Sequence, residues 1–223
     1  MQKKEDERKQ INTVIFDFGG IIVENPDSDM FDHMGVVTGV EKERLLPILQ
    51  EVIPKIQTGV ISEADACWEI EKRLKIKINI SPVSFFTVNL QLKPETVEII
   101  KELLMKEYKV AILTNTIPSH FKRIRALLMK AIPELEEKYI LASCNLGVRK
   151  DGRKELSEGQ KDIFRVVLKL LGVNKNQAVF LDDNPDFILQ SQRAGIDSIL
   201  VDPKTTKLKE LLFSRLSRPY PSE

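Results

Sequence analysis

The chain has 223 residues, 42% of them hydrophobic and 30% charged, a balance that is ordinary for a folded globular protein. This length allows one sizeable domain or a core domain with a smaller insert. The formal net charge of +1 gives no overall electrostatic reason to expect nucleic acid or an anionic membrane as a partner, and no apolar run approaches the length of a membrane span.

The first ten residues are charged, and no apolar stretch follows them, so the sequence predicts a solvated tail rather than a signal peptide. Cys67 and Cys144 lie far apart, without the spacing of a zinc site or of a disulfide framework. We interpret them as two buried thiols in a reducing compartment. Together these features predict a cytosolic protein.

Short, continuous apolar runs are typical of parallel strands that helices cover on both faces. The chain has five such runs, at Thr13–Phe16, Lys109–Leu113, Tyr139–Ala142, Ala178–Leu181 and Ser198–Val201. Helical patterns lie between them: Pro94 begins one before the second run, and Gly172 ends another that starts at Ile163. Strands that alternate with helices predict an α/β fold with a doubly wound parallel sheet.

Residues 25–92 separate the first two predicted strands, which is too long for a simple crossover. Their pattern indicates helices at Lys42–Lys55 and Ser62–Leu74. We therefore predict a core formed by residues 1–24 and 93–223, with residues 25–92 inserted after the first strand as a helical cap. A polar, glycine-containing stretch from 150 to 159 is predicted to be a surface loop.

Polar residues follow four of the predicted strands at their carboxyl ends, where ligands bind in open parallel sheets. In chain order they are Asp17, the pair Thr114 and Asn115, then Lys150, and finally the pair Asp182 and Asp183. Carboxylates gathered in one small volume repel one another and call for a cation, and their hard oxygen ligands suit Mg²⁺. A carboxylate beside Mg²⁺ can attack phosphorus and form an aspartyl phosphate.

Transfer of a phosphoryl group also needs hydrogen-bond donors and positive charge around its oxygens. The Thr114 hydroxyl and the Lys150 ammonium would supply them. Gly19 and Gly20 follow Asp17 and would let backbone amides approach the phosphate closely.

The order of these residues carries a family resemblance. Four segments resemble, in sequence, the four motifs of haloacid-dehalogenase-superfamily hydrolases: Asp17-Phe-Gly-Gly, Leu113-Thr-Asn-Thr, Gly147-Val-Arg-Lys and Phe180-Leu-Asp-Asp-Asn-Pro. The match covers residues 12 to 202 and implies a Rossmann-like core with a cap. The subgroup it resembles most has Asp-x-Gly in the first motif, Asn-Thr in the second and a later His, here His120. That subgroup includes sugar-phosphate phosphatases, among them α-glucose-1-phosphate phosphatases.

The resemblance implies a role for each matching residue. The implied catalytic residues are Asp17 as nucleophile, Thr114 and Lys150. The implied Mg²⁺ ligands are Asp17, the backbone carbonyl of Gly19, Asp182 and Asp183, and the candidate substrate-binding residues are Gly19, Gly20, Asn115 and His120. The expected substrate is a small phosphorylated metabolite, with a sugar phosphate favoured.

Two positions depart from the family pattern. Most phosphatases of the family have a second Asp two residues after the nucleophile, which protonates the leaving group; here that residue is Gly19. A missing general acid typically lowers the rate roughly 10²–10⁴-fold, and His120 is a candidate substitute. In the third motif the usual Lys-Pro is absent, so Lys161 competes with Lys150 as the active-site lysine.

Other functions use similar residues. A dehalogenase would share Asp17 and Lys150 but needs no Mg²⁺, and the paired Asp182 and Asp183 favour the metal-dependent reaction. A phosphomutase would transfer the phosphoryl group to a sugar instead of water. A catalytically weak or inactive protein would keep the fold for binding or regulation. Receiver domains carry their paired acids first and their Lys last, which is the reverse of the order here.

Overall fold

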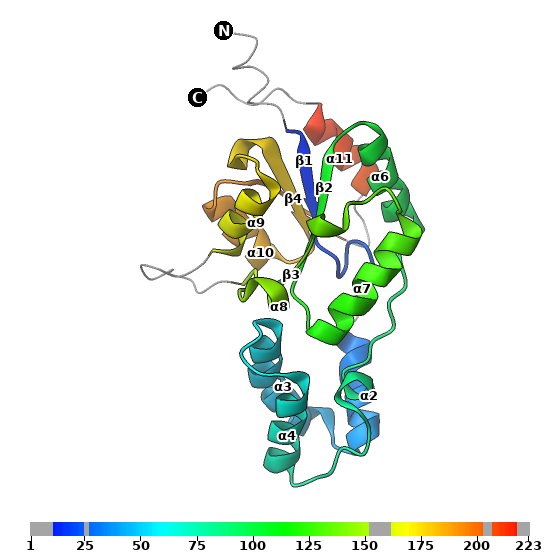
Figure 1. Cartoon of the computed structure of the whole chain (residues 1–223), viewed down its shortest axis with the longest axis vertical. Helices are drawn as coiled ribbons and strands as arrows, with labels where there is room; N and C mark the ends of the chain where they lie inside the picture. The colour runs from blue at the N-terminus through cyan, green and yellow to red at the C-terminus, as the bar shows by residue number, and fades with distance from the viewer. Residues whose placement is uncertain (1–10, 25–26, 152–161, 203–206, 218–223) are drawn as a thin grey trace.

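Five parallel strands form a single sheet in the computed structural model, which describes residues 11–24, 27–151, 162–202 and 207–217. The strands are β1 (Thr13–Phe16), β2 (Lys109–Thr114), β3 (Ile140–Ala142), β4 (Ala178–Asp182) and β5 (Asp197–Leu200), in the spatial order β3-β2-β1-β4-β5. The chain adds β2 and β3 on one side of β1 and then β4 and β5 on the other, so the order reverses at β1 (Figure 1). The predicted doubly wound α/β fold is therefore confirmed.

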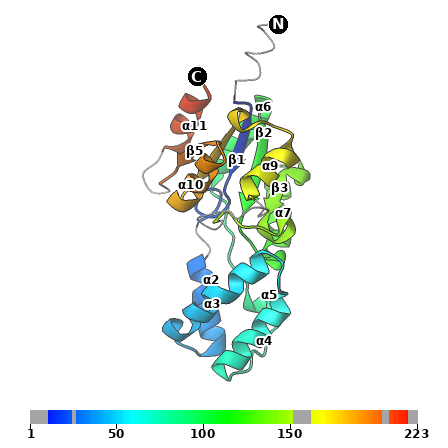
Figure 2. The same ribbon diagram turned by 90° about the vertical axis from the view of Figure 1, so that its left-hand side faces the viewer.

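Helices cover both faces of this sheet, as Figures 1 and 2 show from two directions. One layer consists of α6 (Pro94–Met105), α7 (Pro118–Ala131) and α11 (Leu208–Leu216), and the other of α9 (Ile163–Leu171) and α10 (Pro185–Arg193). Successive residues of β1 point to opposite layers: Val14 and Phe16 pack with the first, and Ile15 packs with the second. Because both faces are buried, the strand is a continuous apolar run.

A group of helices lies beyond the carboxyl end of the sheet and packs around a hydrophobic cluster of its own (Figure 1). They are α2 (Asp27–Thr38), α3 (Lys42–Gln57), α4 (Glu63–Leu74) and α5 (Pro82–Phe85). Helix α3 buries Leu45, Leu49, Val52 and Ile56, a spacing that puts them on one helix face. The two helices predicted in this insert correspond to α3 and α4, whereas α2 and α5 are additions to the prediction.

Short elements complete the described chain: the helix α8 (Ser143–Leu146) and two 3₁₀ turns, η1 (Glu137–Tyr139) and η2 (Lys175–Gln177). The predicted fifth strand starts and ends one residue earlier in the structure. The interpretation of both cysteines as buried is wrong for Cys144, which is half-buried on α8 because that helix lies at the edge of the core, and right for Cys67.

The predicted tail at residues 1–10 and most of the predicted loop, from residue 152 onward, lie outside the described residues. None of the helices in the described ranges combines the length and the apolar character that crossing a membrane requires.

Candidate active site

Two carboxylates are placed side by side by the register of the central strands. Phe16 of β1 pairs with Leu181 of β4, so the residues that follow them, Asp17 and Asp182, are neighbours at the carboxyl end of the sheet. The Asp17 backbone N–H donates to the Leu181 carbonyl at 2.8 Å and continues the ladder by one residue. This is the point where the strand order reverses, and ligands of doubly wound sheets bind there.

Asp183 joins these two residues in a cluster of three carboxylates. Each of the three offers an oxygen, and these oxygens all lie within 4.8 Å of one another. Asp182 is fully buried, whereas Asp183 is partly accessible and lines the adjacent cavity. Three oxygen ligands of like charge at this spacing fit a hard divalent cation such as Mg²⁺.

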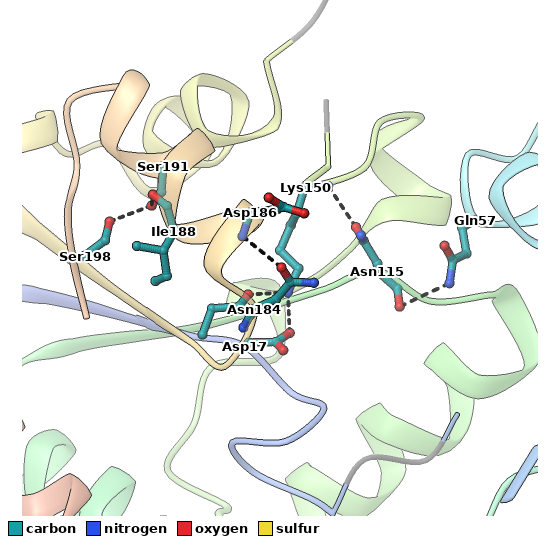
Figure 3. Close-up of polar contacts among 10 residues, drawn as sticks. Asp17, Gln57, Asn115, Lys150, Asn184, Asp186, Ile188, Ser191 and Ser198 are labelled. Atoms are coloured by element: carbon teal, nitrogen blue, oxygen red, sulfur yellow. Dashed lines mark hydrogen bonds and ion pairs between the residues drawn. The ribbon is translucent and has the colours of Figure 1, made fainter. Parts of the chain in front are cut away.

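Lys150 is buried between two of these carboxylates. Its Nζ donates to Asp17 Oδ1 at 2.5 Å (Figure 3) and to Asp182 Oδ2 at 2.7 Å, and the residue is only 2% exposed. The rival Lys161 lies outside the described residues. The geometry therefore brings Lys150 to the carboxylates, 133 residues along the chain from Asp17.

Burial and charge together set the protonation of this cluster. Burial raises the pKa of Asp17 to about 7, opposed by the adjacent Lys150 ammonium and reinforced by the neighbouring Asp182 carboxylate. Burial also raises the pKa of Asp183, again reinforced by Asp182. For Lys150, burial acts to lower the pKa, but the two carboxylates outweigh it and raise that pKa above its ordinary value. A divalent cation at the carboxylates would favour their charged forms.

The end of β2 contributes two further side chains to the same place. Thr114 is its last residue, is buried, and lines the cavity beside Asp17. Asn115 follows, and its Oδ1 accepts a hydrogen bond of 2.9 Å from the Lys150 backbone N–H. This bond ties the segment that carries Lys150 to the end of β2, and Thr114 and Lys150 line the same cavity as the nucleophile candidate Asp17.

The two glycines after Asp17 have different surroundings. Gly19 lines the cavity, and it is not among the glycines with a positive φ. Gly20 does not line the cavity; its φ is +71°, and a Cβ at this position would overlap the Asp183 carboxylate. Lys93 Nζ donates to the Gly20 carbonyl at 2.7 Å. Gly20 thus lets the backbone pass directly behind a carboxylate of the cluster.

Replacing Gly20 by Ala is therefore expected to displace Asp183 and to weaken Mg²⁺ binding about tenfold or more, because a group that orients a metal ligand contributes to affinity. Calorimetric titration with Mg²⁺ measures the effect. Gly35→Ala is the matched control, since a Cβ there would lie an ordinary 3.6 Å from the Val40 carbonyl. Equal Mg²⁺ affinity in Gly20→Ala and wild type would contradict the expectation.

His120 lies in the cavity wall on α7, but its ring is held by the insert. Its Nε2 contacts the backbone carbonyl of Phe86, and because a carbonyl only accepts, this nitrogen carries the ring proton. Burial lowers the pKa of His120 and so favours the neutral ring. In that form Nδ1 has no proton to donate, which argues against His120 as the missing general acid.

The cavity that these residues line has a volume of about 340 Å³ and is closed on one side by the insert. The wall includes seven residues predicted from the sequence: Asp17, Gly19, Thr114, Asn115, His120, Lys150 and Asp183. Lining residues that were not predicted include Gln57, Arg149 and Phe187. Arg149 directly precedes Lys150 in the third motif and could have been found from it, whereas Gln57 ends α3 in a segment with no chemical signature.

Comparisons with known proteins agree with this arrangement. A family model described as haloacid dehalogenase-like hydrolase matches residues 11–195. Among solved structures, a HAD-like family hydrolase from Porphyromonas gingivalis is similar with a TM-score of 0.70 at 18% identity, covering 94% of this chain and 99% of that one. A HAD family enzyme from Bacteroides thetaiotaomicron, solved with magnesium and inorganic phosphate, gives a TM-score of 0.66 at 18% identity over 93% and 100% of the two chains. A dehalogenase solved as an intermediate complex gives a TM-score of 0.59 at 16% identity, covering 89% of this chain and 88% of that one.

Proposed function

This chain belongs to the haloacid dehalogenase-like hydrolase family, and from that premise we propose that it is a Mg²⁺-dependent phosphomonoesterase. Its substrate class is a small phosphorylated metabolite, in particular a sugar phosphate. The observation that carries the proposal is the cluster of three carboxylates with Lys150 bonded to two of them, next to a cavity whose wall includes Asp17, Lys150 and Asp183. The magnesium and phosphate in the Bacteroides thetaiotaomicron neighbour support the same class of ligand.

In this proposal Asp17 is the nucleophile. One of its carboxylate oxygens attacks phosphorus, the bond from phosphorus to the leaving oxygen breaks, and an aspartyl phosphate forms that water then hydrolyses. Lys150 holds the Asp17 carboxylate in place and brings positive charge to the phosphoryl oxygens, and the Thr114 hydroxyl donates to one of them. Asp17, Asp182, Asp183 and the Gly19 carbonyl would hold Mg²⁺, which neutralises the charge that the phosphate brings to this site.

We assign residues 25–92 to a cap and residues 1–24 and 93–223 to the core. The insert contributes Met30, Ile53, Gln57, Phe86 and Leu90 to the wall of the cavity that Asp17 and Asp183 of the core also line. Most of these side chains are apolar, so the cap would cover the leaving group and exclude water from the site during the first step.

A screen of phosphate monoesters tests the proposal, run with Mg²⁺ and with excess EDTA. We expect release of inorganic phosphate in Mg²⁺ from p-nitrophenyl phosphate and from at least one sugar phosphate, and no release in EDTA. Halide release from a 2-halo acid in EDTA would instead establish a dehalogenase. Transfer of phosphate to an added sugar would establish a mutase, and Mg²⁺ binding without any turnover would establish a binding protein.

Gly19→Asp tests whether the cavity lacks a general acid. Gly19 lines the cavity two residues after Asp17, and its φ is not in the region that only glycine readily adopts. A carboxylic acid here would be able to protonate the leaving oxygen, so we expect turnover of alkyl phosphates to rise roughly tenfold. Turnover of p-nitrophenyl phosphate should change less, because its leaving group needs little protonation. Equal changes in kcat for the two esters would contradict this reading.

A further inference from the structure

Two polar atoms in the wall of the cavity are buried without a hydrogen-bond partner among the described residues. They are Gln57 Oε1, on the last residue of α3, and Asn115 Nδ2, directly after β2. One belongs to the insert and the other to the core, and both side chains line the same cavity. Unpaired buried polar atoms are uncommon in native proteins, because each one loses its hydrogen bonds to water.

The orientation of both amides follows from their neighbours. Asn115 Oδ1 accepts from the Lys150 backbone N–H at 2.9 Å, which leaves Nδ2 as the unpaired end. Gln57 Nε2 faces the Asn115 backbone carbonyl at 3.5 Å, a long hydrogen bond, and Oε1 is therefore its unpaired end (Figure 3). Each of these two cavity-lining residues therefore keeps one buried atom without a partner, a donor on Asn115 and an acceptor on Gln57.

Contacts between the insert and the core hold Gln57 at this place. Gly59, two residues later, has a φ of +70°, and a Cβ there would lie 3.3 Å from the Cys144 carbonyl, so the turn after α3 lies close against α8. The Thr58 hydroxyl closes the end of α3 by donating to the Pro54 carbonyl at 2.9 Å. A hydrogen bond from the Ser119 hydroxyl to the Glu63 carboxylate adds a second link between insert and core.

We propose that Gln57 is a specificity-determining residue, and that Gln57 Oε1 together with Asn115 Nδ2 recognises a hydroxyl group on the leaving alcohol. A hydroxyl fits both atoms, because it can donate to an amide oxygen and accept from an amide nitrogen. The inference rests on the proposed phosphomonoesterase function and narrows its substrates to esters of polyhydroxylated alcohols. A site built to hydrogen-bond a hydroxyl rejects analogues that lack it, since its own polar atoms then stay unpaired.

The test combines Gln57→Met with removal of single hydroxyls from the substrate. Wild type and variant are assayed on the sugar phosphate that the screen finds best, on its monodeoxy analogues, and on cyclohexylmethyl phosphate. In wild type we expect one monodeoxy analogue to lose about tenfold in kcat/KM. In Gln57→Met the kcat/KM of the same analogue should be close to that of the parent sugar phosphate, because the hydroxyl no longer has its partner in this variant. Gln50→Met is the matched control, because Gln50 is an exposed residue on the same helix. It should leave the kcat/KM of each analogue, relative to the parent sugar phosphate, as it is in wild type.

Two results would overturn the inference. One is that Gln57→Met lowers kcat/KM by the same factor for the sugar phosphate and for each of its analogues, because a uniform loss marks a structural defect rather than lost recognition of one hydroxyl. The other is wild-type turnover of cyclohexylmethyl phosphate that equals turnover of the sugar phosphates.

Calorimetric binding of the same esters separates this inference from the proposed function. Hydroxyl-dependent binding without any turnover would contradict the function alone, and absence of both sugar-phosphate binding and turnover would contradict the inference as well.

Discussion

Replacing Asp17 by Asn is expected to lower kcat for p-nitrophenyl phosphate by at least about 10³-fold, because the amide cannot form the acyl phosphate. Asn has the shape of Asp, so the fold should survive the change. The substitution also removes one of the two buried carboxylates that bond Lys150. The charge of the Lys150 ammonium is then still balanced by Asp182. The measurement is steady-state hydrolysis in Mg²⁺, together with the thermal unfolding midpoint of both proteins.

Chemical trapping can assign the nucleophile directly. Acid quenching during turnover, followed by borohydride reduction, converts an acyl phosphate at position 17 to homoserine, which peptide mass spectrometry detects. Asp186→Asn is the matched control, because Asp186 is an exposed acid on the first turn of α10 whose backbone N–H is bonded to Asn184. Full turnover in Asp17→Asn, or a trapped phosphate on another residue, would rule out the proposed mechanism.

The core of the fold could be predicted because its strands have an unambiguous pattern. The run at β1 is short, consists of β-branched and aromatic residues and is soon followed by two glycines, and these features favour a buried strand over a buried helix. The carboxylates could be placed for a related reason, since they directly follow two such strands and parallel register makes them neighbours. The extra helices α2 and α5 have no comparable signal; α5 is only four residues long.

The cavity wall opposite the carboxylates could not be predicted from local sequence. Gln57 reaches the cavity only because α3 ends there and the following turn packs against α8, which are tertiary contacts. The same holds for His120: its place on α7 follows from the sequence pattern, but the Phe86 carbonyl that fixes its tautomer comes from the insert. Such contacts depend on how two packed units meet, and neither unit encodes them alone.

Lys150→Met is expected to reduce both stability and turnover. The side chain is buried between Asp17 and Asp182, and its removal leaves two carboxylates close together without a balancing charge. Breaking a buried pair in this way costs about 3–5 kcal/mol. For a chain of this size that loss lowers the unfolding midpoint by roughly 6 °C or more, as differential scanning calorimetry would show. Turnover should fall about 10²–10³-fold, since the phosphoryl oxygens lose a charged donor.

Added Mg²⁺ should restore more stability to Lys150→Met than it adds to wild type, because a divalent cation can neutralise the carboxylates that the ammonium no longer balances. Lys161→Met is the matched control, since it removes the competing lysine of the third motif and is expected to keep wild-type turnover and wild-type stability. If Lys161→Met were inactive and Lys150→Met active, the assignment of the lysine would have to be reversed. A Lys150 variant with an unchanged midpoint would show instead that Asp17 and Asp182 do not carry their charges together in the folded protein.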